Sequence, residues 1–120
     1  MIVSSIKDVK GVNVINEAYK NVVGRVLISP ETGWDDYVMR MFELGKDGYS
    51  ADHQHDFPHI VFVLDGTGLL VLDGEEKPIE SGSFAYIPNN SQHQLLNKGT
   101  GDEKLKFICI VHQEDHVPFE

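Results

Sequence analysis

The sequence predicts an all-β fold, a single closed barrel of the jelly-roll type. Short apolar runs, rich in β-branched and aromatic residues, alternate with turns of Gly, Pro, Asn and Asp along most of the chain. Short strands at such close spacing are typical of a β-barrel or β-sandwich. No segment shows the sustained 3.6-residue periodicity of an amphipathic helix. We therefore expect residues 1–120 to form one domain in which strands supply nearly all of the core.

Length and composition are those of one globular domain. The chain has 120 residues, of which 41% are hydrophobic and 24% charged, and this length suffices to bury a core. The net charge of −9 argues against nucleic acid as a partner. No apolar run approaches the length of a membrane span, and the first residues lack the pattern of a signal peptide. The single cysteine, Cys109, fits a reducing compartment. We expect a cytoplasmic protein that binds neither nucleic acid nor membrane.

The expected strands follow from the apolar runs in chain order. Residues 1–20 are predicted to form an N-terminal arm or edge strand followed by a polar loop, and residues 45–48 are predicted to turn. A further strand is expected after Gly82 and another around His93, on either side of a Pro-Asn-Asn turn. The remaining strands are predicted at 22–28, 37–44, 60–64, 69–72, 77–80 and 105–111.

Alternation within two strands predicts which side chains point inward. In residues 105–111 the odd positions are all apolar, so we expect the inner face to hold Leu105, Phe107, Cys109 and Val111. In residues 60–64 the same reasoning leaves Ile60, Phe62 and Leu64 on the outer face. A lone small barrel would expose that apolar surface, so we expect a homodimer.

Charged residues in the strand at 37–44 are expected to avoid the core. Arg40 and Glu43 are the only charges there, and we predict an outward or rim position for both.

Four histidines form a pattern typical of a metal site. His53, His55 and His59 lie within seven residues, and in an extended chain their side chains would share one face. His93 follows the Pro-Asn-Asn turn on a later strand. Neutral imidazoles bind Zn, Cu, Fe, Ni and, more weakly, Mn. A single histidine is more often structural, but four in this spacing predict a metal site. His112 and His116, in a polar tail, are expected to face solvent.

Two stretches carry a resemblance to a known family. Residues 48–68, G-Y-S-A-D-H-Q-H-D-F-P-H-I-V-F-V-L-D-G-T-G, resemble the first motif of the cupins. Residues 82–97, G-S-F-A-Y-I-P-N-N-S-Q-H-Q-L-L-N, resemble the second. His59 stands where the family usually has Glu. Asn90 stands where it usually has Gly, and must accept a left-handed conformation.

The resemblance implies a single-domain cupin of the four-histidine kind. It would bind one divalent metal ion per chain, with Mn or Fe as first choice and Zn, Ni or Cu also possible. The implied ligands are His53, His55, His59 and His93.

The residues around the predicted metal site suggest a pocket but no acid or base. Phe57 shares the face of the histidines and could line the mouth with Phe107, Tyr86 could offer a polar contact, and Cys109 points toward the same interior. The catalytic residues stay unknown because the chemistry would be that of the metal.

We expect a metal-dependent oxygenase that activates dioxygen and a small organic substrate. The alternatives are a metal-dependent isomerase or lyase of a hydroxy-carbonyl compound, or a non-catalytic small-ligand-binding module.

Overall fold

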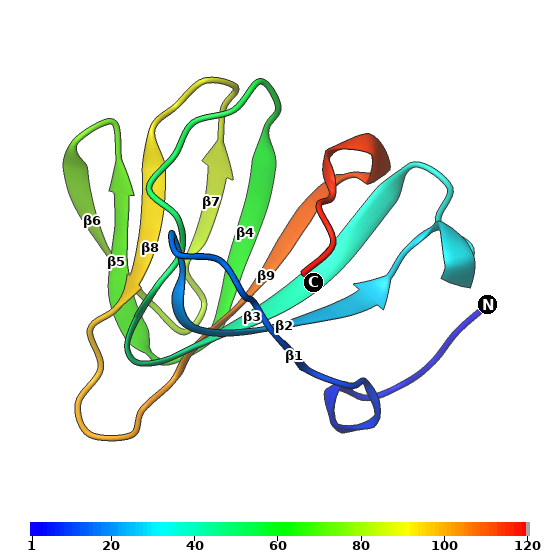
Figure 1. Ribbon diagram of the computed structural model, residues 1–120, viewed down its shortest axis with the longest axis horizontal. Helices are drawn as coiled ribbons and strands as arrows, with labels where there is room; N and C mark the ends of the chain where they lie inside the picture. The colour runs from blue at the N-terminus through cyan, green and yellow to red at the C-terminus, as the bar shows by residue number, and fades with distance from the viewer. Residues whose placement is uncertain (120) are drawn as a thin grey trace.

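A computed structural model describes residues 1–119 and consists almost wholly of β-strands (Figure 1). Three short 3-10 turns, η1 (Ile6–Asp8), η2 (Pro30–Thr32) and η3 (Gln113–Asp115), are the helical elements of these residues. No helix in this part of the chain is long and apolar enough to cross a membrane. The strands are β1 (Val12–Asn13), β2 (Lys20–Ile28), β3 (Tyr37–Tyr49), β4 (His59–Asp65), β5 (Thr67–Leu72), β6 (Glu75–Glu80), β7 (Phe84–Ile87), β8 (His93–Asn97) and β9 (Leu105–His112).

The nine strands form one antiparallel sheet that curls into a barrel. Its order is β6-β5-β8-β3-β9-β4-β7, with β2 paired to β3 and β1 paired to β2. In Figure 1, β5, β6 and β8 stand together at one side, and β2, β3 and β9 run together at the other. The long strand β3 joins the two groups, since its last residue, Tyr49, pairs with Leu96 of β8. The predicted all-β barrel is confirmed.

The inner face of the barrel is apolar, as the alternation predicts. Leu105, Phe107, Cys109 and Val111 of β9 are all buried and belong to the main core cluster, together with Val61 and Val63 of β4. On the outer face of β4, Ile60 is 52% exposed and Phe62 is 45% exposed. Both predictions of strand orientation are therefore confirmed.

Two local predictions around β3 are wrong. Residues 45–48 do not form a turn, because β3 continues through them to Tyr49. The pairing of β3 with β2 shifts register at this point, and Asp47 adopts a φ of 56° within the strand. Residues 50–58 are not a strand but an irregular loop, in which His53 makes a single bridge to His93. The histidines therefore converge from a loop and two strand ends rather than from one strand face.

The position of Arg40 also differs from the prediction. Its side chain is only 7% exposed and faces the interior, because it shares the alternation of Val38 and Leu44 along β3. Glu43 lies on the opposite face, where it pairs with Arg25. Asn90 adopts the left-handed conformation expected of it, with a φ of 61°.

Candidate metal centre

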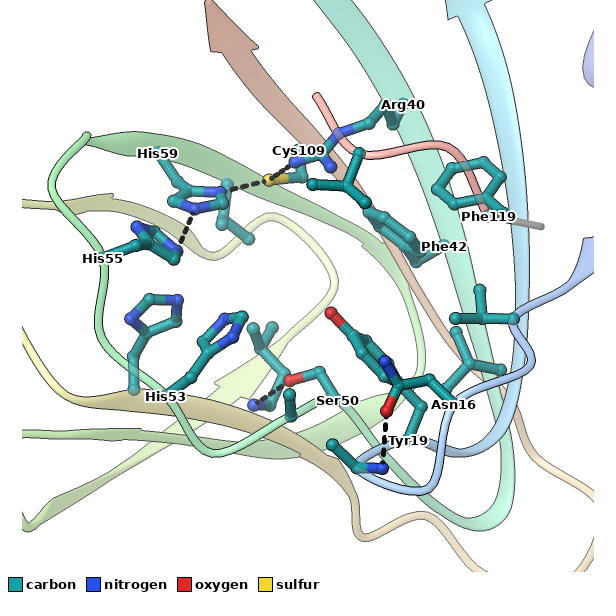
Figure 2. A pocket seen from close by; sticks show the side chains of 18 of the residues that line it. Asn16, Tyr19, Arg40, Phe42, Ser50, His53, His55, His59, Cys109 and Phe119 are labelled. Carbon is teal, nitrogen blue, oxygen red and sulfur yellow. Dashed lines mark hydrogen bonds between the residues drawn. The ribbon is translucent and has the colours of Figure 1, made fainter. Parts of the chain in front are cut away.

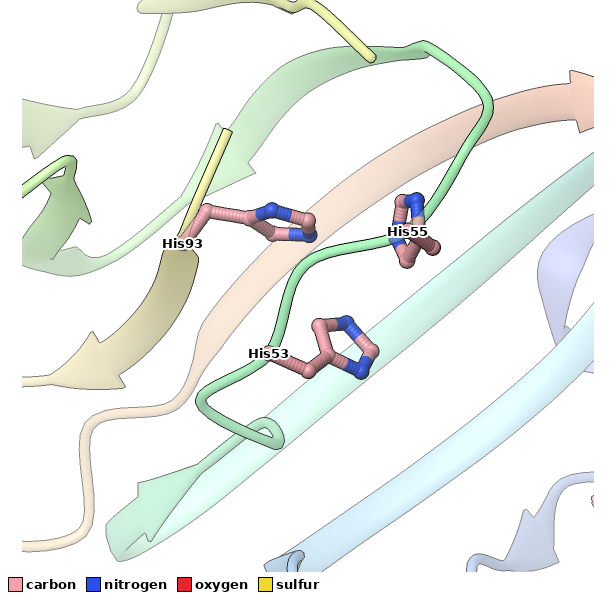
Figure 3. Close-up of side chains that lie close together, drawn as sticks. All are labelled: His53, His55 and His93. Atoms are coloured by element: carbon pink, nitrogen blue, oxygen red, sulfur yellow. The ribbon is translucent and has the colours of Figure 1, made fainter. Parts of the chain in front are cut away.

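Three imidazoles meet at one end of the barrel interior. His53 and His55 lie in the loop between β3 and β4, and His93 begins β8. One ring nitrogen of each lies within 4.8 Å of the others, and Figure 3 shows the three rings turned toward a common point. The backbone holds this arrangement, since His53 N–H donates to His93 O at 3.1 Å and His93 N–H donates to His53 O at 2.9 Å. These two hydrogen bonds join the two histidine motifs directly.

Backbone carbonyls fix the orientation of two of the rings. Nδ1 of His55 lies 3.0 Å from Phe57 O, and Nδ1 of His93 lies 2.8 Å from Ser91 O. A carbonyl oxygen only accepts, so each Nδ1 carries the proton and donates it. The Nε2 lone pair of each ring is then free for a metal, which is how metal-binding histidines are usually oriented.

His59, the fourth predicted ligand, lies beside this group rather than within it. It begins β4, and its Nε2 lies 2.6 Å from Nε2 of His55. Its Nδ1 lies 2.9 Å from Sγ of Cys109 on β9. The structure thus brings three of the four predicted residues into one group and places the fourth in contact with one member.

Burial favours the neutral form of three of these imidazoles, those of His53, His55 and His59. Burial, reinforced by the nearby His93, lowers the pKa of His53 to about 4, and burial, reinforced by His55 and Arg40, lowers that of His59 to about 2. The pKa of His55 is lowered too, again chiefly by burial. At neutral pH the ring nitrogens therefore keep the lone pairs that a metal needs. Such an all-imidazole set fits a divalent transition metal.

The histidines line a cavity of about 600 Å³ inside the barrel. Phe57, Phe107 and Cys109 line it, as the sequence suggests. Tyr86 does not, because it lies on the outer face of β7 beside Ile60 and is 63% exposed. Its proposed contact with a substrate is therefore wrong.

Arg40 is a lining residue that sequence reasoning missed. In Figure 2 its guanidinium lies next to Cys109, which in turn contacts His59. The Nη2 atom of Arg40 donates to Cys109 Sγ at 3.1 Å, because the two residues are register partners on β3 and β9. Burial raises the pKa of the Cys109 thiol, so the sulfur is a neutral acceptor at pH 7. The alternation of apolar residues along β3 was the signal that could have placed Arg40 inside.

The segment before β2 and the segment after β9 complete the cavity wall. Tyr19, in the segment that leads into β2, and Phe119, near the C-terminus, both line it. The ring of Phe119 packs edge-on against Phe42, with centroids 5.4 Å apart. His116 is half-buried and packs against Phe119, so the prediction of a solvated histidine there is wrong.

The comparison with known families agrees with the two histidine motifs. Residues 40–111 match the family described as the cupin domain. The chain belongs to this family. The match begins at Arg40 on β3 and ends at Val111 on β9, so it includes all four of the candidate ligands.

Individual relatives of this cupin include proteins named as enzymes. The chain is 31% identical over 90 residues to dimethylsulfoniopropionate lyase DddW of Ruegeria pomeroyi. The matched region covers 74% of this chain and 57% of that relative. The curated relatives are longer, since the chain spans between 27% and 57% of their lengths.

Two solved structures overlay on most of the chain. The polyketide cyclase RemF of Streptomyces resistomycificus has a TM-score of 0.84 and 26% identity, covering 94% of this chain and 80% of that one. A cupin-2 domain protein of Rhodospirillum rubrum has a TM-score of 0.81 and 26% identity, covering 98% and 78%.

Proposed function

We propose that this cupin is a metal-dependent enzyme that converts a small organic molecule inside its barrel. The observation that carries the proposal is the convergence of His53, His55 and His93 within 4.8 Å at the wall of a 600 Å³ cavity. Each chain would bind one divalent ion through these three residues. Mn or Fe is the first choice, with Zn, Ni or Cu as further candidates.

His59 is proposed as the fourth ligand. Its Nε2 faces Nε2 of His55 at 2.6 Å, while Nδ1 of both rings is engaged with another acceptor. In the tautomer that donates Nδ1–H to Cys109 Sγ, which also accepts from Arg40, Nε2 of His59 carries a lone pair. Two lone pairs then face each other, and they repel unless they share a cation. A metal ion bound to both rings would supply that cation.

The chain's own residues hold, orient and shield the reacting centre. A bound divalent ion supplies Lewis-acid chemistry, polarising a carbonyl, hydroxyl or carboxylate oxygen of the substrate. Phe57 stacks on His55 with ring centroids 3.8 Å apart and limits water access from that side. Val61, Ile87 and Phe107 form an apolar wall on which the carbon skeleton of a substrate can pack.

The reaction we favour is a non-oxidative lyase or isomerase step on an oxygenated compound. The similarity to a protein named as a lyase supports this choice, and so does the overlay on a protein named as a cyclase. The oxygenase expected from the sequence is the second candidate. It would use the same histidines, and the apolar cavity lining would suit dioxygen. Oxygen uptake separates the two.

The test is metal content combined with activity. The purified protein should contain close to one divalent ion per chain, and His55→Ala or His93→Ala should lose it without unfolding. His112→Ala is the matched control, because His112 lies outside the cavity lining. Full occupancy in both ligand variants would contradict the proposal.

Turnover of hydroxy-carbonyl compounds under argon would support the lyase or isomerase. Turnover that consumes dioxygen would assign the oxygenase instead. A metal-replete protein that converts no compound of either panel would leave the non-catalytic binding module.

A further inference from the structure

The cavity contains one permanent positive charge that no acidic side chain of residues 1–119 neutralises. Among the cavity-lining residues of the described range, Arg40 is the only Lys or Arg. Its guanidinium is charged at every accessible pH. The ion pairs of residues 1–119 are Arg25–Glu43, Lys77–Glu75 and Lys104–Glu43, and none involves Arg40. A buried cation without a counterion is strongly unfavourable in a folded protein.

The contacts that Arg40 does make leave part of its guanidinium unsatisfied. Nη2 donates to the Cys109 thiol, and Cζ lies 5.2 Å from the centroid of the Phe42 ring. A thiol is a weak acceptor, and an aromatic ring offsets the charge only partly. The Nε–H group is buried and has no hydrogen-bond partner within the described residues.

The other charged groups of the cavity wall do not fill this role. The two carboxylates that line it, Asp52 and Asp115, make no ion pair with Arg40 within 4.0 Å. Asp52 instead accepts from the side chain of Gln92 at 2.9 Å. The other basic groups that line the cavity are imidazoles, and an imidazole cannot serve as a counterion for a cation. The guanidinium is therefore a cationic element of the cavity wall, on the same side as His59 (Figure 2).

We propose that Arg40 is the substrate-binding residue of the cavity and that its ligand is a small organic carboxylate. The carboxylate would bind the guanidinium, which forms strong charge-assisted hydrogen bonds with such groups. The remainder of the molecule would extend toward the histidine cluster. As a statement about substrates this inference rests on the proposed enzymatic function. As a statement about anion binding it does not, because Arg40 carries its charge whether or not a metal is bound.

The test uses metal-free, ¹⁵N-labelled protein in a buffer without carboxylate or phosphate. Propanoate and benzoate are titrated, each beside its uncharged amide, and the Nε–H resonance of Arg40 is followed with the backbone amides. We expect both acids to shift the Arg40 resonance saturably, and both amides to bind far more weakly. Removing the metal ensures that a carboxylate bound to the ion is not mistaken for one bound to Arg40.

Variants distinguish an effect of the positive charge at Arg40 from an effect of the net charge of the protein. Arg40→Gln should weaken binding of both acids by about 30-fold or more, the usual effect of removing one partner of a buried charged pair. Lys106→Gln is the matched control, because it removes one positive charge from the outer face of β9 and should change affinity little. The affinity of Arg40→Lys for the acids should lie between that of Arg40→Gln and that of the wild type, since lysine keeps the charge but lacks Nε–H.

The outcomes decide the inference without depending on the metal. Acids that bind no better than their amides to the wild-type protein would overturn it, and that comparison needs no variant to fold. Equal affinity of Arg40→Gln and the wild type for benzoate would overturn it as well. If the acids bind as expected but the purified protein never holds a metal, the anion site stands and the proposed metal-dependent function fails.

Discussion

Nε2 of His55 and Nε2 of His59 lie 2.6 Å apart, and Nδ1 of each ring faces a different acceptor. His55 is tied to the carbonyl of its own loop, whereas His59 is tied to a sulfur on β9. The contact therefore joins the irregular loop between β3 and β4 to the barrel wall. The two ring nitrogens are thus close enough for both to bind one cation after a small shift, and this leads to the first prediction.

Cys109 is expected to raise the affinity for the metal by orienting the ring of His59. Changing Cys109 to Ala removes the acceptor that orients the ring, so metal affinity should fall by about 10-fold or more, as for other partners of metal ligands. Cys109→Ser keeps an acceptor and should lose less. Competition with a fluorescent chelator measures both. Equal affinities in the wild type and the Ala variant would show that His59 is not a ligand.

Acid should release the metal only well below the ordinary pKa of histidine. Protons compete with the metal for the same ring nitrogens. Burial lowers the pKa of His53 from 6.5 to about 4 and also lowers the pKa values of His55 and His59. Protons therefore begin to displace the metal from these nitrogens only once the pH falls below 6.5. We expect full retention at pH 7 and loss between pH 6 and about 4. Elemental analysis after dialysis at each pH is the measurement, and half-release at or above pH 6.5 would contradict it.

Arg40→Met should stabilise the metal-free, ligand-free protein. The substitution replaces a buried charge that has no counterion among residues 1–119 by an apolar side chain of similar length, which removes the cost of desolvating that charge. Denaturant unfolding of both proteins measures the free energy of unfolding. A variant markedly less stable than the wild type would mean that Arg40 is neutralised within the folded chain. The same change should weaken carboxylate binding, so stability and binding would move in opposite directions.

A homodimer is expected to bury the apolar outer face of β4 and β7. Ile60 and Phe62 are exposed there, and their register partners on β7, Tyr86 and Phe84, are 63% and 82% exposed. Burying a large apolar side chain contributes about 1.5–3 kcal/mol. Light scattering at micromolar concentration should give a dimer mass for the wild type and a monomer mass for Phe62→Lys. A monomeric wild type would contradict the expectation.

Most of the barrel could be predicted because its strands alternate clearly. The runs around Val61 and Phe107 carry β-branched and aromatic residues on one face, and the structure buries that face. What could not be predicted depends on contacts between distant segments. Asp47 stays within a long strand because β2 shifts register beside it, although Gly-Lys-Asp-Gly is a favourable turn sequence.

The candidate site was predicted in part for the same reason. The histidine spacing pointed to four residues, and the rings of three of them, His53, His55 and His93, converge. Arg40 was missed because a charge within a strand is usually placed outside, and only the cavity makes an inner position tolerable. Tyr86 was misplaced because its neighbours Ala85 and Ile87, not Tyr86 itself, share the inward alternation of β7.

An anomalous-difference map from crystals of the purified, metal-replete protein tests the central claim most directly. Data collected above and below the absorption edge of the ion identified by elemental analysis locate that ion without any assumption about its ligands. We predict one peak per chain about 2.0–2.3 Å from a ring nitrogen of each of His53, His55 and His93, with His59 at a similar distance. A map with no peak between these three rings, in protein that contains the metal, would contradict the account.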